Sequence, residues 1–150
     1  MAYWLMKSEP SAYSIDDLKR EGQTHWDGIR NYQARNYMRE MQLGDEAFFY
    51  HSNCSPPGIV GMMKVIKTVY TDHTAFDPKD IHFDPKSKQD QPRWEMVDLA
   101  YGATFPNILS LSALRAEPSL ETLVILRKGN RLSITPLSEG EWQVILKLAS

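Results

Sequence analysis

Apolar positions near the start of the chain predict a strand followed by a short helix. The aromatic-rich run Ala2–Met6 is typical of a strand. Ser14 stands three residues before Asp17, the spacing of a capping box, so we expect a helix over Ile15–Glu21. Gly22 then ends this helix, because glycine readily adopts the backbone conformation found just after a helix C-terminus.

A second helix is predicted after a polar loop that carries Trp26, and the Asn31 side chain can cap it. Its apolar positions recur at the spacing of one buried face, which comprises Ala34, Tyr37, Met38 and Met41. The positions of Tyr32, Asn36 and Arg39 fall on the opposite side. No apolar period surrounds Trp26, so we expect its side chain to line an open pocket rather than the core.

The middle of the chain predicts strands separated by one long connection. Glu46–Ser52 and Ile59–Tyr70 are rich in aromatic and β-branched residues and flank the turn sequence Ser55–Gly58, which indicates a hairpin. The polar stretch Thr71–Pro92 repeats Asp-Pro pairs, and we expect a surface excursion with little regular structure. Strand character resumes over Trp94–Phe105.

The C-terminal part predicts mainly helices. Leu111–Ala116 and Leu120–Leu126 have helical character, and Arg131–Ile134 is expected to be a short strand. Ser138 and Glu141 form a second capping-box pattern. The helix that it opens has four apolar residues on its expected core side: Trp142, Ile145, Leu146 and Leu148. Helices that interrupt the strands, rather than alternate with them, favour an α+β fold with a mixed or closed β-barrel flanked by helices.

Length and charge narrow the class of protein. The 150 residues are enough for one sizeable core, so we expect a single domain over residues 1–150. A net charge of −2 excludes nucleic-acid binding by overall charge, and any nucleic acid must meet a local basic patch. No apolar run is long enough to cross a bilayer. We therefore expect no membrane partner and a cytoplasmic or nuclear location.

Common catalytic and metal-binding patterns are absent from the sequence. His51 and Cys54 lie three residues apart, but no second pair follows at the interval of a zinc site. The same two side chains have no evident orienting partner for nucleophilic catalysis. The glycines form no phosphate-binding loop. We expect no metal, no cofactor and no catalytic group.

Aromatic side chains instead recur near hydrogen-bonding ones. The aromatic members are Trp4, Tyr13, Trp26, Tyr32, Tyr50 and Trp94. The polar members are Lys7, Ser8, Arg30, Asn31, Arg35, Asn36, His51 and Ser52. This mixture suits a flat heterocycle, because an aromatic face stacks on a base while amides and hydroxyls contact its edge. Trp4 is the exception, since its apolar strand favours a place in the core.

Four phrases resemble the EVE domain family: WLMKSEPSAYSIDDL, WDGIRNYQARNYMREMQLGDEAFFYHS, GIVGMMKV and RLSITPLSEGEW. They extend from Trp4 to Trp142. The resemblance implies a PUA-like fold, a mixed β-barrel flanked by helices, in the superfamily that also holds the YTH and SRA readers of modified bases. It also implies recognition of modified cytosine in DNA.

Local similarity to YTH domains, together with side-chain chemistry, predicts the members of a base pocket. These are Lys7, Ser8, Trp26, Arg30, Asn31, Tyr50, His51, Ser52 and Trp94. Trp26 would offer a stacking face, with Tyr50 or Trp94 closing the other side. Arg35 and Asn36 are assigned to the nucleic-acid backbone, because positive charge near phosphate explains arginines at a helix start better than helix stability does.

Three functions follow from this pocket. The first is a non-catalytic reader of a modified base, of the carbon-5-modified cytosine class, in DNA, in RNA or as a free nucleoside. The second is an enzyme acting on a nucleobase or small heterocycle, with Glu9, Asp27 or His51 as acid or base. The third is an adaptor whose partners are proteins. The sequence favours the first.

Overall fold

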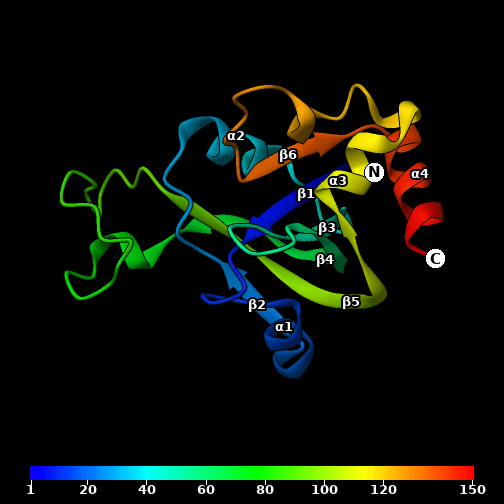
Figure 1. The fold of residues 1–150 in the computed structure, drawn as a ribbon. Helices are drawn as coiled ribbons and strands as arrows, with labels where there is room; N and C mark the ends of the chain where they lie inside the picture. The colour runs from blue at the N-terminus through cyan, green and yellow to red at the C-terminus, as the bar shows by residue number, and fades with distance from the viewer.

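The computed structural model describes residues 1–150 and is built on a six-stranded sheet with the order β2-β5-β4-β3-β1-β6 (Figure 1). The strands are β1 (Tyr3–Ser8), β2 (Gln23–Trp26), β3 (Glu46–His51), β4 (Gly58–Thr71), β5 (Glu95–Ser110) and β6 (Ile134–Leu137). The helices are α1 (Ile15–Glu21), α2 (Tyr32–Glu40), α3 (Leu111–Ala116) and α4 (Glu139–Ala149). Three short 3-10 helices complete the elements: η1 (His73–Phe76), η2 (Pro118–Leu120) and η3 (Val124–Leu126). The α+β class is confirmed.

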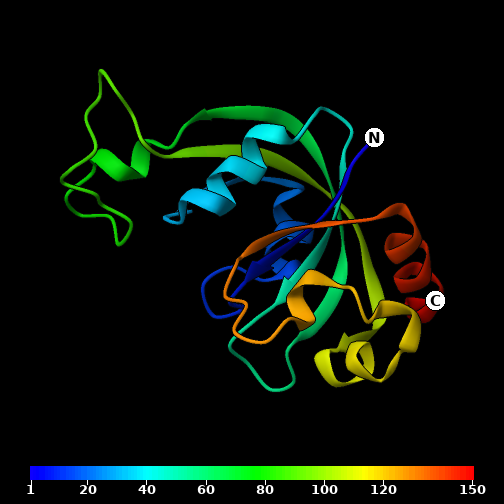
Figure 2. The ribbon, with the colours of Figure 1, turned by 90° about the horizontal axis from the view of Figure 1, so that it is seen from above.

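The sheet is mixed and open. β1 pairs parallel with β3, and every other neighbouring pair is antiparallel. The two edge strands, β2 and β6, lie at opposite ends of the strand order and do not pair with each other, although the sheet is strongly curled (Figure 2). The sheet is therefore not closed, and the predicted mixed β-barrel flanked by helices describes it only in a loose sense.

Alternating side chains give the sheet two buried faces. Trp4 and Met6 of β1 and Phe49 of β3 pack in one cluster with residues of α1 and α2. Leu5, between Trp4 and Met6, and Phe48, directly before Phe49, point to the other face. There they pack with residues of α3, α4 and the 3-10 helices η2 and η3. Each cluster excludes apolar surface from water, which supplies most of the stabilisation of the fold.

Most predicted elements are confirmed, and the differences have physical reasons. The capping boxes of α1 and α4 both form, and Met38 of α2 is fully buried. The helix expected at Leu120–Leu126 does not form: η2 ends at Leu120, and η3 covers only Val124–Leu126. The strand expected at Arg131–Ile134 begins only at Ile134. Trp26 ends the strand β2 instead of lying in a loop, because pairing with Val97 of β5 extends the backbone there.

The segment between β4 and β5 has little regular structure, as predicted, but it is not simply a surface loop. It projects from the sheet (green in Figures 1 and 2). Four aspartates each accept a hydrogen bond from the backbone N–H two residues later: Asp72, Asp77, Asp80 and Asp84. Such Asx turns give the segment a defined shape without a sheet or helix. No helix of the structure has the length and apolar character needed to span a membrane.

Candidate functional site

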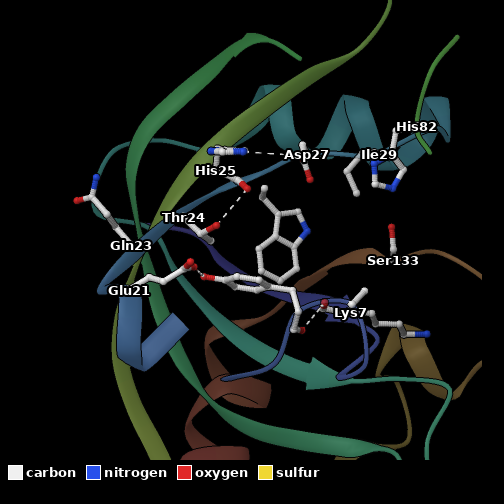
Figure 3. Close-up of a pocket in the computed structure, with 14 residues that line it drawn as sticks. Lys7, Glu21, Gln23, Thr24, His25, Asp27, Ile29, His82 and Ser133 are labelled. Carbon is white, nitrogen blue, oxygen red and sulfur yellow. Dashed lines mark hydrogen bonds and ion pairs between the residues drawn. The ribbon is translucent and has the colours of Figure 1, made fainter. Parts of the chain in front are cut away.

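A cavity of about 670 Å³ opens beside the end of β1, along β2 and the loop that leads to α2 (Figure 3). Its volume lies in the ordinary range of small-ligand sites. The residues that line it are Lys7, Ser8, Ala12, Tyr13, Glu21, Gln23, Thr24, His25, Trp26, Asp27, Gly28, Ile29, His82 and Ser133. Residues far apart in the sequence therefore share one cavity.

Two aromatic side chains contribute to the walls. Trp26 is 7% exposed and meets the ring of Phe49 edge to face, with ring centroids 5.4 Å apart, so it belongs to both the core and the cavity. The Tyr13 hydroxyl donates a hydrogen bond to the Glu21 carboxylate. Burial, followed by this hydrogen bond, raises the pKa of Tyr13 to about 12, so the hydroxyl stays protonated at neutral pH.

Hydrogen-bonding groups of both kinds surround the cavity. The Ser8 hydroxyl donates to the Tyr13 carbonyl at 2.7 Å, so only its oxygen lone pairs remain for a ligand. Lys7 forms no ion pair, and burial lowers the pKa of its ammonium group. The Asp27 carboxylate lies 3.6 Å from Nε2 of His25. Figure 3 shows Asp27, Ile29 and His82 along one rim, with Lys7 across from them.

Arg30 holds the rim of the cavity in place. Its guanidinium group donates to the Asp72 carboxylate at 3.0 Å, to the Thr74 hydroxyl at 3.1 Å and to the His82 carbonyl at 2.9 Å. Asp72 also accepts from the backbone N–H of Gly28 at 2.9 Å. These bonds join the loop after β2 to the segment after β4. The cavity wall is therefore fixed by a buried carboxylate that does not itself line it.

Gly28 packs directly beneath His82, and we expect Gly28→Ala to destabilise the rim. Gly28 has a φ of +77°, and a Cβ atom there would lie 2.5 Å from Nε2 of the imidazole. Gly129 has the same φ but open space around it, which makes Gly129→Ala the matched control for backbone strain. The loss in Gly28→Ala should exceed that in Gly129→Ala by about 0.5–1.5 kcal/mol in urea unfolding, because the partly exposed His82 imidazole can turn aside at the cost of an off-rotamer side chain. Equal losses would contradict the contact with His82.

The sequence-predicted site residues are only partly brought together. Lys7, Ser8 and Trp26 line the cavity, but Arg30 faces Asp72 and does not. Asn31 caps α2, where its side chain accepts from the Ala34 N–H at 2.9 Å.

Three more predicted residues follow one another at the end of β3 and lie outside the cavity. Tyr50 packs on the opposite face of the sheet, because residues alternate along the strand. Nε2 of His51 accepts from the backbone N–H of Ile15 at 3.1 Å, and burial lowers the pKa of this imidazole. The Ser52 N–H donates to the Ser8 carbonyl, which ties the end of β3 to the cavity wall.

Trp94 and the two predicted backbone contacts gather near α2 instead. The Trp94 ring is 6% exposed and stacks on Tyr32. Arg35 donates to the carbonyl of Arg93 at 3.0 Å, and Asn36 is exposed beside it. These residues form a separate surface next to the cavity rim, because Arg30 contacts both His82 and the Trp94 ring.

Several lining residues could not be found from sequence spacing. Ile29 looks like an ordinary loop residue, and His82 and Ser133 come from distant segments. The repeated aspartates of the segment after β4 are the one available signal, since they indicate a chain shaped by Asx turns. Groups of three or more His, Cys, Asp or Glu side chains placed to hold a metal ion are absent from the structure.

Residues 2–148 match the EVE domain family. The chain is 43% identical to human thymocyte nuclear protein 1 over 166 residues, covering 98% of this chain and 73% of that protein. A Pseudomonas syringae protein of known structure is 48% identical with a TM-score of 0.97, covering 99% of this chain and 100% of that one. Human THYN1 protein, crystallised with DNA containing 5-methylcytosine, is 43% identical with a TM-score of 0.95, covering 100% and 98%. The chain therefore belongs to the EVE domain family.

Proposed function

We propose that residues 1–150 form one nucleic-acid-binding domain that holds a modified base, of the carbon-5-modified cytosine class, in the cavity beside Trp26. One observation carries the proposal: an aromatic wall borders a cavity of about 670 Å³ whose rim offers both hydrogen-bond donors and acceptors. The related human THYN1 protein, crystallised with DNA containing 5-methylcytosine, supports the same class of ligand. The domain binds without chemical change to the base.

The rim groups match the edge of a cytosine. Its amino group donates, and the Asp27 carboxylate and the Ser8 lone pairs can accept. Ile29 supplies an apolar surface for a carbon-5 methyl group, and Trp26 stacks on the ring.

The base enters this cavity only when it is unstacked, so the ligand is a flipped base, a single strand or a free nucleoside. A strand in the cavity continues over the surface around α2. Arg35 and Asn36 lie there and would contact its sugar-phosphate backbone.

Catalysis on the base is the second candidate, and one contact favours it. Asp27 and His25 lie 3.6 Å apart at the cavity, which is a carboxylate–imidazole pair of the kind used in acid–base chemistry. The other groups considered from the sequence lie elsewhere. Glu9 accepts a hydrogen bond from Asn53, and His51 accepts from the N-terminal end of α1.

Titration with single-stranded oligonucleotides that carry one 5-methylcytosine or one cytosine tests the proposal at fixed salt. We expect the methylated strand to bind about 5- to 150-fold more tightly, the effect of about 1–3 kcal/mol for one methyl group in an apolar site. Asp27→Asn should weaken the binding of both strands, because it replaces a carboxylate that only accepts hydrogen bonds. Asp16→Asn, on the exposed side of α1, is the matched control. Equal affinities for both strands, or a product with altered mass, would overturn the reader function.

A further inference from the structure

The ring of Tyr32 is an exposed aromatic surface on a rigid support. Tyr32 begins α2 and is 51% exposed. Its ring stacks on Trp94, with centroids 4.8 Å apart and planes 25° from parallel. Trp94 is itself buried, and its indole N–H donates to the Asp84 carboxylate at 2.7 Å. The tyrosine ring therefore rests on a fixed partner, although half of the residue faces water.

One face of the Tyr32 ring is free. The Arg35 guanidinium carbon lies 4.7 Å from the centre of the Tyr32 ring and 6.0 Å from that of Trp94. If Arg35 and Trp94 covered opposite faces of the Tyr32 ring, the distance between Arg35 and the Trp94 ring would be roughly twice the distance from either group to the Tyr32 ring. The 6.0 Å distance excludes this sandwich. Arg35 lies beside the stack, and the outer face of Tyr32 is open.

One unpaired cation lies beside this face: the Arg35 guanidinium group forms no ion pair, whereas that of Arg30 is paired with Asp72. The guanidinium groups of Arg30 and Arg35 both lie near the Trp94 ring, and the first turn of α2 has no acidic residue. The nearby carboxylates already have partners. Asp72 pairs with Arg30, Asp84 accepts from the Trp94 indole, and Glu95 pairs with Arg39.

We propose that Tyr32, Trp94 and Arg35 form a second base-binding site, which takes the unmodified nucleotide next to the one in the cavity. This inference rests on the proposed function. The base stacks on the open face of Tyr32, and its phosphate meets the Arg35 guanidinium group. Arg30 connects the two sites, because it contacts the Trp94 ring and donates to the carbonyl of His82, which lines the cavity.

A thermodynamic cycle between the ring and the neighbouring base tests this site. The ligands are a single strand with one central 5-methylcytosine and the same strand with abasic residues on both sides of it. For the wild type, the abasic strand should bind about 5- to 150-fold more weakly, the size of one base–aromatic contact. Tyr32→Ala should lose the same factor on the intact strand and nothing further on the abasic strand. Tyr32→Phe should retain the wild-type behaviour, and the adjacent exposed Gln33→Ala is the matched control.

The two proposals can fail separately. A preference for 5-methylcytosine over cytosine reports on the cavity, and the effect of the abasic neighbours reports on Tyr32. An affinity that is indifferent to the neighbours, or a Tyr32→Ala loss of equal size on both strands, would overturn the second site while the cavity stands. A Tyr32→Ala variant that changes only the oligomeric state would assign the open face to a second copy of the chain and likewise overturn it.

Discussion

Replacing Asp72 with alanine is expected to lower the free energy of unfolding by about 3–5 kcal/mol, as for removal of one partner from a buried ion pair. The Asp72 side chain is 0% exposed, whereas that of Arg30 is 22% exposed, which places the loss toward the lower end. The substitution leaves the Gly28 and Thr74 N–H groups without their acceptor and frees the guanidinium group that holds His82. Urea unfolding of both proteins measures the difference.

Asp77→Ala is the matched control for this prediction. Asp77 belongs to the same segment and caps one exposed turn through the Lys79 N–H. Its removal should cost about 0.5–1.5 kcal/mol, the ordinary value of a single hydrogen bond. Similar losses in the two variants would show that Asp72 is only one turn residue among several.

The effect of Asp72 should also depend on pH. Burial alone would raise the pKa of this carboxyl, but hydrogen bonds from Thr74, Gly28 and Arg30 outweigh burial and hold the pKa below its usual 3.8. Its ionised form therefore stabilises the folded state above the unfolded pKa, and this contribution is lost as the pH falls through the folded pKa. The difference in stability between wild type and Asp72→Ala should be largest at neutral pH and shrink below about pH 4.

Trp26→Ala should reduce both stability and binding. The ring is 7% exposed and packs against Phe49, so the free energy of unfolding should fall by about 3–5 kcal/mol, as for other buried aromatic truncations. The expectation that Trp26 lines an open pocket rather than the core is thus corrected, because the ring does both. Loss of stacking should further weaken binding of a 5-methylcytosine strand by about 1–3 kcal/mol.

Folding and binding can be separated at this position. Trp26→Phe keeps an aromatic face and should retain more stability than Trp26→Ala, because it leaves a smaller void. Affinities are compared at a temperature where circular dichroism shows each variant to be folded. A folded Trp26→Ala that binds as tightly as wild type would remove Trp26 from the site. A stability loss below about 0.5 kcal/mol, typical of surface positions, would remove it from the core.

Local signals predicted the elements whose ends are set by neighbouring residues. Helix α1 has the predicted bounds, because Ser14 and Asp17 cap it and Gly22 follows it. The prediction of a helix over Leu120–Leu126 failed because its local pattern fits two kinds of helix. Its buried residues Leu120 and Leu123 are three apart, and this spacing fits a 3-10 turn as well as an α-helix.

The cavity was less predictable than the fold, because its walls come from long-range contacts. Local similarity to YTH domains predicted that Trp26 and the Lys7-Ser8 pair belong to the pocket. The approach of His82 to Gly28 depends on Asp72 and Arg30, which are 42 residues apart in sequence. Tyr50 was predicted in the pocket but lies elsewhere. Its chemistry suits a pocket, but the alternation of side chains along β3 places it on the other face of the sheet.

The position of β1 in the sheet has a consequence for the order of folding. β1 lies between β3 and β6, and its Leu5 and Met6 pair with Thr135 and Ile134. During synthesis, β1 emerges before both of its neighbours, and β6 follows it only after more than a hundred further residues. Until then one side of an apolar strand has unpaired backbone groups, the kind of edge to which other chains add. Until residues 134–137 leave the ribosome, the nascent chain therefore keeps an apolar strand edge open to other chains.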